Sequence, residues 1–274
     1  MNHIRSYLYV PGDRPDRLAK AMSRGADALI VDLEDAVPSA SKADARRNVA
    51  DWLAGLGSTH TPVWIRVNAG PERNDDIRAI ADAPHVTGLV LAKADSPGDV
   101  EEVADQLSGI GSPLRLAPLI ESAAGVLAVR EIAAAPRVEV LHLGELDLAA
   151  DIGASPGADG AELHHSRSMV VLASRAAQIS PPVAPVDAVI DDLAHFRATT
   201  EALARMGFVG RACIHPAQVA VAQEVFTPSA DDIAWARELL ESEKSSTHGA
   251  RRGRDGRMVD EAVLRRARAL SQWS

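Results

Sequence analysis

Two acidic residues, Glu121 and Asp147, have the chemistry and the spacing to bind a metal ion. They lie just after two short apolar segments, at residues 114–120 and 138–143, that we expect to be consecutive β-strands. Neighbouring strands lie about 4.8 Å apart, so carboxylates placed in this way can share one small hard cation. Mg²⁺ typically takes one or two carboxylates together with water and substrate oxygens. The alternative is that each acid only caps the helix that follows it.

A second group of charged residues could bind an anionic substrate. Asp32, Glu34 and Asp35 cluster at the end of the apolar segment at 28–32, and Arg66 lies at the end of the next one. The planar guanidinium of Arg66 can bind a carboxylate or an enolate oxygen through two parallel hydrogen bonds. It can also pair with the neighbouring acids, and both roles can hold together. Glu34 or Asp35 is expected to hold a metal-bound water molecule or an arginine.

Two further cations, Lys93 and Arg14, are candidates for binding or catalysis. Lys93 follows the expected strand at 89–92, where a lysine could form a Schiff base with a carbonyl substrate. The nearby carboxylates should keep its amine protonated, so an ion-pair role is favoured. Arg14 ends a turn at residues 11–14, and its guanidinium and the backbone amides of this turn could hold a phosphate group.

Most of these charged residues lie at the C-terminal ends of short apolar segments. We expect eight such segments to be strands, at residues 7–10, 28–32, 63–67, 89–92, 114–120, 138–143, 183–186 and 211–214. Strands that alternate regularly with helices favour a parallel sheet, and eight units favour a closed TIM (β/α)8 barrel of about 250 residues. In such a barrel all the strand ends face one mouth, which is where barrel enzymes place their chemistry.

The expected helices follow the strands and then continue beyond the last one. They are expected at residues 14–24, after 39, from about 75, and at 97–107, 123–134, 161–178, 193–206, 217–225 and 229–242. We therefore assign residues 1–243 to an α/β barrel domain with C-terminal helices. Residues 244–274 are expected to be a mobile linker followed by a lid-like helical extension, because 244–256 is rich in Gly and Arg and 259–270 is helical by pattern. This helix could dock on its own barrel or on a neighbouring subunit.

Composition excludes several classes of function. The 274 residues have a formal net charge of −9 and only 3% aromatic residues, which argues against binding to nucleic acid. The N-terminus has no signal-peptide pattern, and no apolar stretch approaches the roughly 18 residues that a membrane helix needs. The single cysteine, Cys213, fits a reducing compartment. We therefore expect a cytoplasmic protein without a membrane or nucleic-acid partner.

Seven segments resemble one known family, in order and over nearly the whole chain. The family is the citrate lyase beta subunit-like (CitE-like) group of the HpcH/HpaI aldolase/citrate lyase superfamily. The segments are RSYLYVPG at 5–12, DLEDAV at 32–37, Lys42 with Ala45 and Arg46, RVN at 66–68, LIES at 119–122, GELDL at 144–148 and IHPAQ at 214–218. One such motif would be weak, but seven in order are specific.

The resemblance implies a TIM barrel that uses Mg²⁺ and forms a homotrimer or homohexamer. By matching motifs, Glu121 and Asp147 are the implied metal ligands and Arg66 is the implied substrate-binding residue. Residues 255–260 look like the C-terminal lid of many relatives, which closes the active site of the neighbouring subunit. Asp260 matches the lid aspartate proposed there as an acid/base.

The implied activity is reversible carbon–carbon cleavage of a 3-hydroxy-acyl-CoA thioester, such as a citryl-, malyl- or citramalyl-CoA-like substrate. The products are a 2-oxo acid and a short acyl-CoA. We expect Arg14, Glu34 and Asp35 to contact the substrate or CoA together with Arg66. Three alternatives remain: a CoA-independent class II-type aldolase on free 2-oxo acids, a non-catalytic acyl-thioester-binding subunit, and cleavage followed by net thioester hydrolysis.

Overall fold

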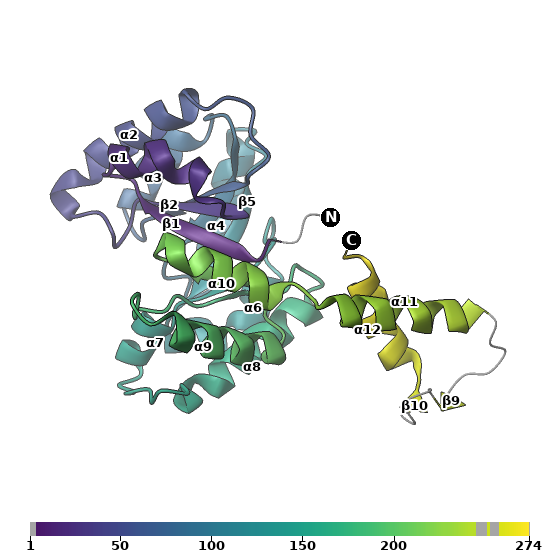
Figure 1. Ribbon diagram of the computed structural model, residues 1–274. Helices are drawn as coiled ribbons and strands as arrows, with labels where there is room; N and C mark the ends of the chain where they lie inside the picture. The colour runs from purple at the N-terminus through teal and green to yellow at the C-terminus, as the bar shows by residue number, and fades with distance from the viewer. Residues whose placement is uncertain (1–3, 245–250, 253–257, 274) are drawn as a thin grey trace. The chain divides into compact units, whose positions relative to one another are not determined.

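Eight parallel strands close into a barrel, with each strand paired to the next and β1 paired to β8 (Figure 1). This computed structural model describes residues 4–244, 251–252 and 258–273. The strands are β1 (Ser6–Pro11), β2 (Ala28–Asp32), β3 (Val63–Val67), β4 (Val86–Leu91), β5 (Arg115–Ile120), β6 (His142–Leu143), β7 (Val183–Ala184) and β8 (Gly210–Cys213). The predicted TIM barrel is confirmed.

The apolar segments are nearly continuous because both faces of each strand are buried. In β2, Ala28 and Ile30 belong to a cluster in the interior of the barrel that includes Trp64 of β3. The alternate residues Leu29 and Val31 belong to the larger cluster between the strands and the outer helices. Since side chains alternate along a strand, one sequence fills both layers and fixes which residues at its end face the mouth.

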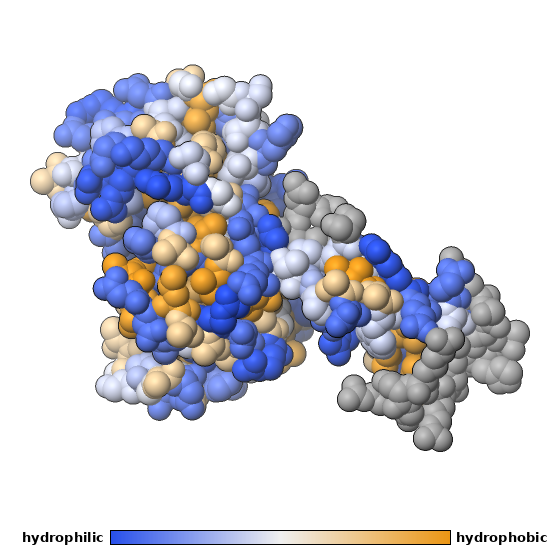
Figure 2. Space-filling view, in the orientation of Figure 1, coloured by the Kyte–Doolittle hydropathy of each residue, from blue (hydrophilic) through white to orange (hydrophobic). Residues whose placement is uncertain are grey.

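The helices of the barrel lie outside the strands (Figure 1). They are α1 (Pro15–Ala21), α2 (Lys42–Ala54), α3 (Glu72–Ile80), α4 (Pro97–Gly109), α5 (Ala123–Leu127), α6 (Val129–Ala133), α7 (Glu145–Asp151), α8 (His164–Ala176), α9 (Leu193–Met206) and α10 (Pro216–Phe226), with 3-10 turns at Met22–Arg24, Ser39–Ser41 and Ala161–Leu163. Figure 2 shows apolar surface around α9 and α10, whereas the surface around α1, α2 and α3 is mostly hydrophilic.

Local signals fix several helix ends. The Ser96 hydroxyl oxygen accepts a hydrogen bond from the backbone N–H of Asp99, and the Asp99 carboxylate accepts one from the backbone N–H of Ser96, which forms a capping box at the start of α4. Helix α9 ends at Gly207, which has a left-handed φ of 108°. This end was expected from the sequence, because glycine adopts that conformation without steric cost.

Several details differ from the expected elements. The strand expected at 138–143 is paired as β6 only at its last two residues, and Val138 makes an isolated bridge to Leu116. Arg137, just before Val138, has a left-handed φ of 65°, so the extended segment does not continue back beyond Val138. The helix expected at 123–134 is divided into α5 and α6 at Ala128, whose ψ is 5°. Helix α7 begins one residue after β6, where the sequence predicted no helix.

By internal contacts the chain divides into residues 4–226 and a second unit that begins at Thr227. In the second unit, α11 (Ala230–Lys244) packs against α12 (Glu261–Ser271), and β9 (Arg251–Arg252) pairs with β10 (Met258–Val259). Leu264 of α12 is buried. Helix α11, which we had grouped with the barrel domain 1–243, therefore groups with the tail.

Most of the expected linker at 244–256, and residues 255–257 of the expected lid, lie outside the described residues. Within the described part of the chain, the longest helices are too short or too polar to cross a membrane.

Candidate active site

Arg66, near the end of β3, forms a buried two-bond contact with Asp32 at the end of β2. Its Nε and Nη2 donate to the two carboxylate oxygens of Asp32 at 2.7 and 2.6 Å. The strands pair with Asp32 opposite Arg66, so the barrel register itself brings the two side chains together. Burial works to lower the pKa of Arg66, but the hydrogen bonds to Asp32 and the surrounding negative charges outweigh it and raise this pKa. Arg66 is therefore a permanent cation at the mouth.

Glu34 and Asp35 follow Asp32 and differ in their exposure. Glu34 Oε2 lies 3.0 Å from Arg66 Nη1, and the Glu34 side chain is only 7% exposed. Asp35 Oδ2 lies 3.7 Å from the same nitrogen, but its side chain is 55% exposed. Burial raises the pKa of Glu34, and Arg66 opposes this increase. The expectation that one of these acids holds an arginine is confirmed for Glu34.

A lysine and an amide fix the backbone that presents Glu34. Lys42 Nζ donates to the carbonyl oxygens of Leu33 and Glu34 at 2.9 and 2.8 Å and to Asn68 Oδ1 at 2.6 Å. Asn68 Nδ2 donates in turn to the Leu33 carbonyl and to Asp76 Oδ2. All three ammonium protons of Lys42 therefore have acceptors, and the loop after β2 is bound to the loop after β3.

We expect Lys42→Met to lower the free energy of unfolding by about 3 kcal/mol, because two carbonyls and one amide oxygen lose a charge-assisted partner. Chemical denaturation of both proteins measures this change. Lys20→Met, at an exposed lysine of α1, is the matched control and should change stability little. An equal and small effect of both substitutions would mean that Lys42 does not stabilise the loop.

Glu121 follows β5 at the mouth and is buried, with 4% of the residue exposed. Its Oε1 accepts the backbone N–H of Lys93 at 2.7 Å, while its Oε2 accepts no hydrogen bond from the described residues. Burial raises the pKa of Glu121 to about 7, although the N–H and the charge of Lys93 oppose this shift. A side chain on Gly144 would lie 2.8 Å from Glu121 Oε2, so only glycine leaves room for this carboxylate.

Asp147 lies in the first turn of α7, and its side chain is 46% exposed. Lys93 Nζ lies 3.6 Å from Asp147 Oδ1, 3.9 Å from Glu121 Oε1 and 3.8 Å from Glu34 Oε1. Glu121 and Asp147, predicted from strand ends alone, thus lie beside the same ammonium group. The ion-pair role expected for Lys93 is confirmed.

The oxygen donors of this site suit a hard cation. No group of three or more His, Cys, Asp or Glu side chains arranged to hold a metal ion occurs among the described residues. Mg²⁺ does not need such a cage, because it keeps several waters and usually takes one or two carboxylates. Glu121 and Asp147 provide two carboxylates, and Oε2 of Glu121 is available to a ligand.

Glu145, two residues before Asp147, pairs with an arginine and does not take part in the group of carboxylates around Lys93. Glu145 is the first residue of α7 and forms a two-bond ion pair with Arg167 of α8, with Nη2 to Oε2 at 2.7 Å. Both side chains are nearly buried, at 13% and 10% exposure. Nothing in the local sequence indicates a pairing over 22 residues. The pair leaves Asp147, two residues on, as the acid of this helix turn that lies beside Lys93.

The remaining two predicted site residues make local contacts. Arg14 precedes α1 and donates to the two carboxylate oxygens of Asp16 at 3.0 and 3.2 Å, and its side chain is about half exposed. Asp260 lies in the second unit, where its Oδ1 accepts the backbone N–H groups of Ala262 and Val263 at 3.0 and 3.1 Å. Asp260 is therefore the N-cap of α12.

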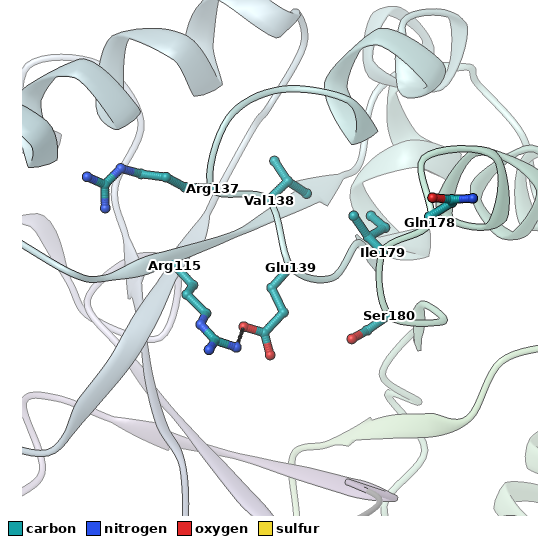
Figure 3. Close-up of a pocket in the computed structure, with 7 residues that line it drawn as sticks. All are labelled: Arg115, Arg137, Val138, Glu139, Gln178, Ile179 and Ser180. Atoms are coloured by element: carbon teal, nitrogen blue, oxygen red, sulfur yellow. Dashed lines mark hydrogen bonds and ion pairs between the residues drawn. The ribbon is translucent and has the colours of Figure 1, made fainter. Parts of the chain in front are cut away.

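A recess of about 400 Å³ lies at the opposite end of the barrel, near the start of β5 and before β6 and β7 (Figure 3). Its charged lining includes Arg115 and Glu139, which form an ion pair with each other. Arg137 donates to the backbone carbonyls of Ser112 and Leu114. Because these charges already have partners, the mouth with its gathered carboxylates is the better candidate site.

A closed parallel barrel with ionisable side chains at the carboxyl ends of its strands has the architecture of a TIM-barrel enzyme. Residues 5–216 match the HpcH/HpaI aldolase/citrate lyase family, and the chain belongs to this family. The resemblance seen in the seven sequence segments is confirmed.

Similar proteins match over nearly their whole length. A citrate lyase subunit beta-like protein of Deinococcus radiodurans is 37% identical, with 97% of this chain and 96% of that protein covered. An L-malyl-CoA/beta-methylmalyl-CoA lyase of Rhodobacter capsulatus is 34% identical, with coverages of 97% and 93%. The fold is similar to that of CitE from Mycobacterium tuberculosis, in the crystal structure of its complex with magnesium, acetoacetate and coenzyme A. The two chains superpose with a TM-score of 0.83 and share 33% sequence identity, with 99% of this chain and 98% of that one covered.

Proposed function

We propose that this protein is a Mg²⁺-dependent carbon–carbon lyase that cleaves a 3-hydroxy-acyl-CoA thioester to a 2-oxo acid and a short acyl-CoA. The main supporting observation is that Glu121 and Asp147 both lie beside the Lys93 ammonium group at the barrel mouth. The buried cation Arg66 lies at the same mouth. The names of the similar proteins agree, since one is a malyl-CoA lyase and another was crystallised with magnesium and coenzyme A.

In this proposal Glu121 and Asp147 hold the metal ion at the ends of β5 and β6. When bound, Mg²⁺ supplies Lewis-acid polarisation of the carboxylate and hydroxyl oxygens of the substrate. Asp260 takes the proton of the 3-hydroxyl group. The carbon–carbon bond then breaks, the hydroxyl carbon becomes the ketone of the 2-oxo acid, and the electron pair passes to the thioester as an enolate.

Arg66 is the proposed group that stabilises this enolate before it takes up a proton. Its guanidinium is oriented in advance by Asp32 and by Glu34, so it needs no reorganisation when negative charge develops. Glu34 and Asp35 are proposed to contact the substrate through this cation. Arg14, which is about half exposed beside β1, is proposed to meet a phosphate group of CoA in exchange for Asp16.

The activity assay uses citryl-, malyl- and citramalyl-CoA, each with Mg²⁺ or with EDTA. We expect at least one thioester to give a 2-oxo acid and an acyl-CoA in equal amounts, and only with Mg²⁺. Cleavage of the corresponding free acids at the same rate would instead indicate a CoA-independent aldolase. Free CoA in place of acyl-CoA would indicate net hydrolysis, and binding without turnover would indicate a non-catalytic subunit.

The tail is proposed to act as a lid over the site of a neighbouring subunit in a cytoplasmic homotrimer or homohexamer. In this proposal residues 244–274 form the lid, together with α11, against which α12 packs. Asp260 would act in trans, and mixing Asp260→Ala with Glu121→Gln subunits should restore activity at sites that combine an intact lid with an intact metal pocket. If subunits exchange and no activity returns, the trans lid is wrong.

The N-cap role of Asp260 calls for a variant that separates capping from acid/base chemistry. Asp260→Ala should remove both, and loss of the cap costs about 1 kcal/mol of stability. Asp260→Ser should keep the cap, because serine is a strong N-cap residue, and should still lose most turnover. Thermal unfolding and steady-state kinetics measure the two effects. An active Asp260→Ser enzyme would leave Asp260 with a structural role alone.

A further inference from the structure

Lys93 is held in an unusual backbone conformation directly after β4. Its φ is 52°, in the left-handed region that residues other than glycine, asparagine and aspartate seldom adopt. The backbone N–H of Lys93 donates to Glu121 Oε1 at 2.7 Å. This bond ties the conformation to the proposed metal ligand and places the lysine side chain at the mouth beside the same carboxylate.

The ammonium group lies among three carboxylates without bonding to any of them. Its distances to Glu34 Oε1, Glu121 Oε1 and Asp147 Oδ1 are 3.8, 3.9 and 3.6 Å, all longer than a hydrogen bond. The three ion pairs are therefore long and nearly equal, whereas a charge-assisted hydrogen bond to one carboxylate would have an N···O distance of about 2.7–2.9 Å. The ammonium group thus lies at similar distances from three carboxylates that come from three different strand ends.

Lys93 is a cation whose three neighbouring carboxylates favour its charged form, and its side chain is open to solvent. The side chain is 44% exposed, and its flexible four-carbon stem lets the ammonium leave the cluster for solvent at small cost.

We propose that Lys93 is a built-in counter-cation of the metal site, which offsets part of the negative charge of Glu121, Asp147 and Glu34 in the metal-free protein and must give way when the divalent ion binds. This inference rests on the proposed metal-dependent function. In this role the ammonium group of Lys93 acts through its charge, and the amine does not need to form a Schiff base with a substrate. Lys93 is thus a positioning residue that sets how tightly and how reversibly the metal is held.

The direction in which metal affinity changes when Lys93 is replaced distinguishes a counter-cation from a purely structural residue. A lysine that only supports the fold would, when removed, loosen the site and weaken metal binding. A competing counter-cation would, when removed, leave the site more negative and strengthen metal binding. Even at the dielectric constant of water, a unit charge near a divalent cation is expected to change its affinity by about tenfold.

The experiment is a calorimetric titration of metal-free wild-type, Lys93→Met and Lys93→Gly proteins with MgCl₂ at low ionic strength, where charges are least screened. Lys93→Gly suits the left-handed backbone and guards against misfolding of the methionine variant. Lys20→Met, at an exposed lysine of α1, is the control. We expect about tenfold or more tighter Mg²⁺ binding in both Lys93 variants and a lower thermal midpoint of the metal-free Lys93→Met protein.

Equal or weaker Mg²⁺ binding in both Lys93 variants, with normal binding in wild type, would overturn the role of Lys93 and leave the proposed function intact. Absence of Mg²⁺ binding in wild type would overturn both proposals. A lower thermal midpoint in the metal-free variant together with tighter metal binding is the combination that only a counter-cation produces.

Discussion

Glu121→Gln is expected to lower Mg²⁺-dependent turnover by about 100-fold or more while leaving the barrel folded. Substitution of residues that only orient metal ligands typically lowers metal affinity or activity by about 10–100-fold. Loss of the charge of a ligand itself should lower them by at least as much. Gln can still accept the backbone N–H of Lys93. Steady-state kinetics at limiting and saturating Mg²⁺ measure the loss.

The fold should tolerate this substitution for an electrostatic reason. Burial raises the pKa of Glu121 to about 7, so the folded protein favours the uncharged form of this side chain. The stabilisation from its raised pKa is present at low pH and is lost as the pH rises from about 4.5 to about 7. A neutral amide avoids that loss, and Glu121→Gln should be at least as stable as wild type at pH 8.

Glu139→Gln is the control for charge removal, because Glu139 pairs with Arg115 at the opposite end of the barrel. Its turnover should remain close to that of wild type. If Glu121→Gln turns over like wild type at limiting Mg²⁺, Glu121 is not a metal ligand and the acids near Asp32 must be tested in its place.

The second large effect is expected at Arg66. Arg66→Lys should lower kcat/KM by about tenfold or more, since lysine cannot reproduce the two parallel bonds to Asp32 or the same planar contact with an enolate. Arg66→Met should also lower the free energy of unfolding by about 3–5 kcal/mol, because Asp32 and Glu34 would remain buried without their cation.

Kinetics and chemical denaturation of the same preparations separate the two roles of Arg66. Arg78→Lys is the matched control, because Arg78 forms an exposed pair with Asp75 and should affect neither quantity much. A less stable Arg66→Lys enzyme with normal kcat/KM would leave Arg66 as an ion-pair partner of the acids after β2 and nothing more.

The barrel could be predicted because its signals are local. Each strand is a short apolar run, and ends such as those of β2 and β3 agree with the structure to the residue. The closeness of Asp32 and Arg66 follows from the order of neighbouring strands in a barrel. The same reasoning placed Glu121 and Asp147 near each other, and both lie beside Lys93.

The contacts that orient these residues could not be predicted, because they join distant parts of the chain. Lys42 reaches Asn68 across 26 residues, and Glu145 reaches Arg167 across 22. No periodicity or turn signal specifies such partners. The N-cap role of Asp260, in contrast, could have been predicted, because an aspartate directly before a helix is a common N-cap signal.

The most direct test of the proposed metal site is anomalous diffraction from crystals of the protein soaked with Mn²⁺, which accepts the same oxygen ligands as Mg²⁺. We expect one strong anomalous peak per chain at the barrel mouth, bonded to carboxylate oxygens of both Glu121 and Asp147, with the Lys93 ammonium moved away. The peak should vanish in Glu121→Gln crystals. A peak elsewhere, or one that persists unchanged in the variant, would contradict the central claim that these two strand-end acids hold the metal.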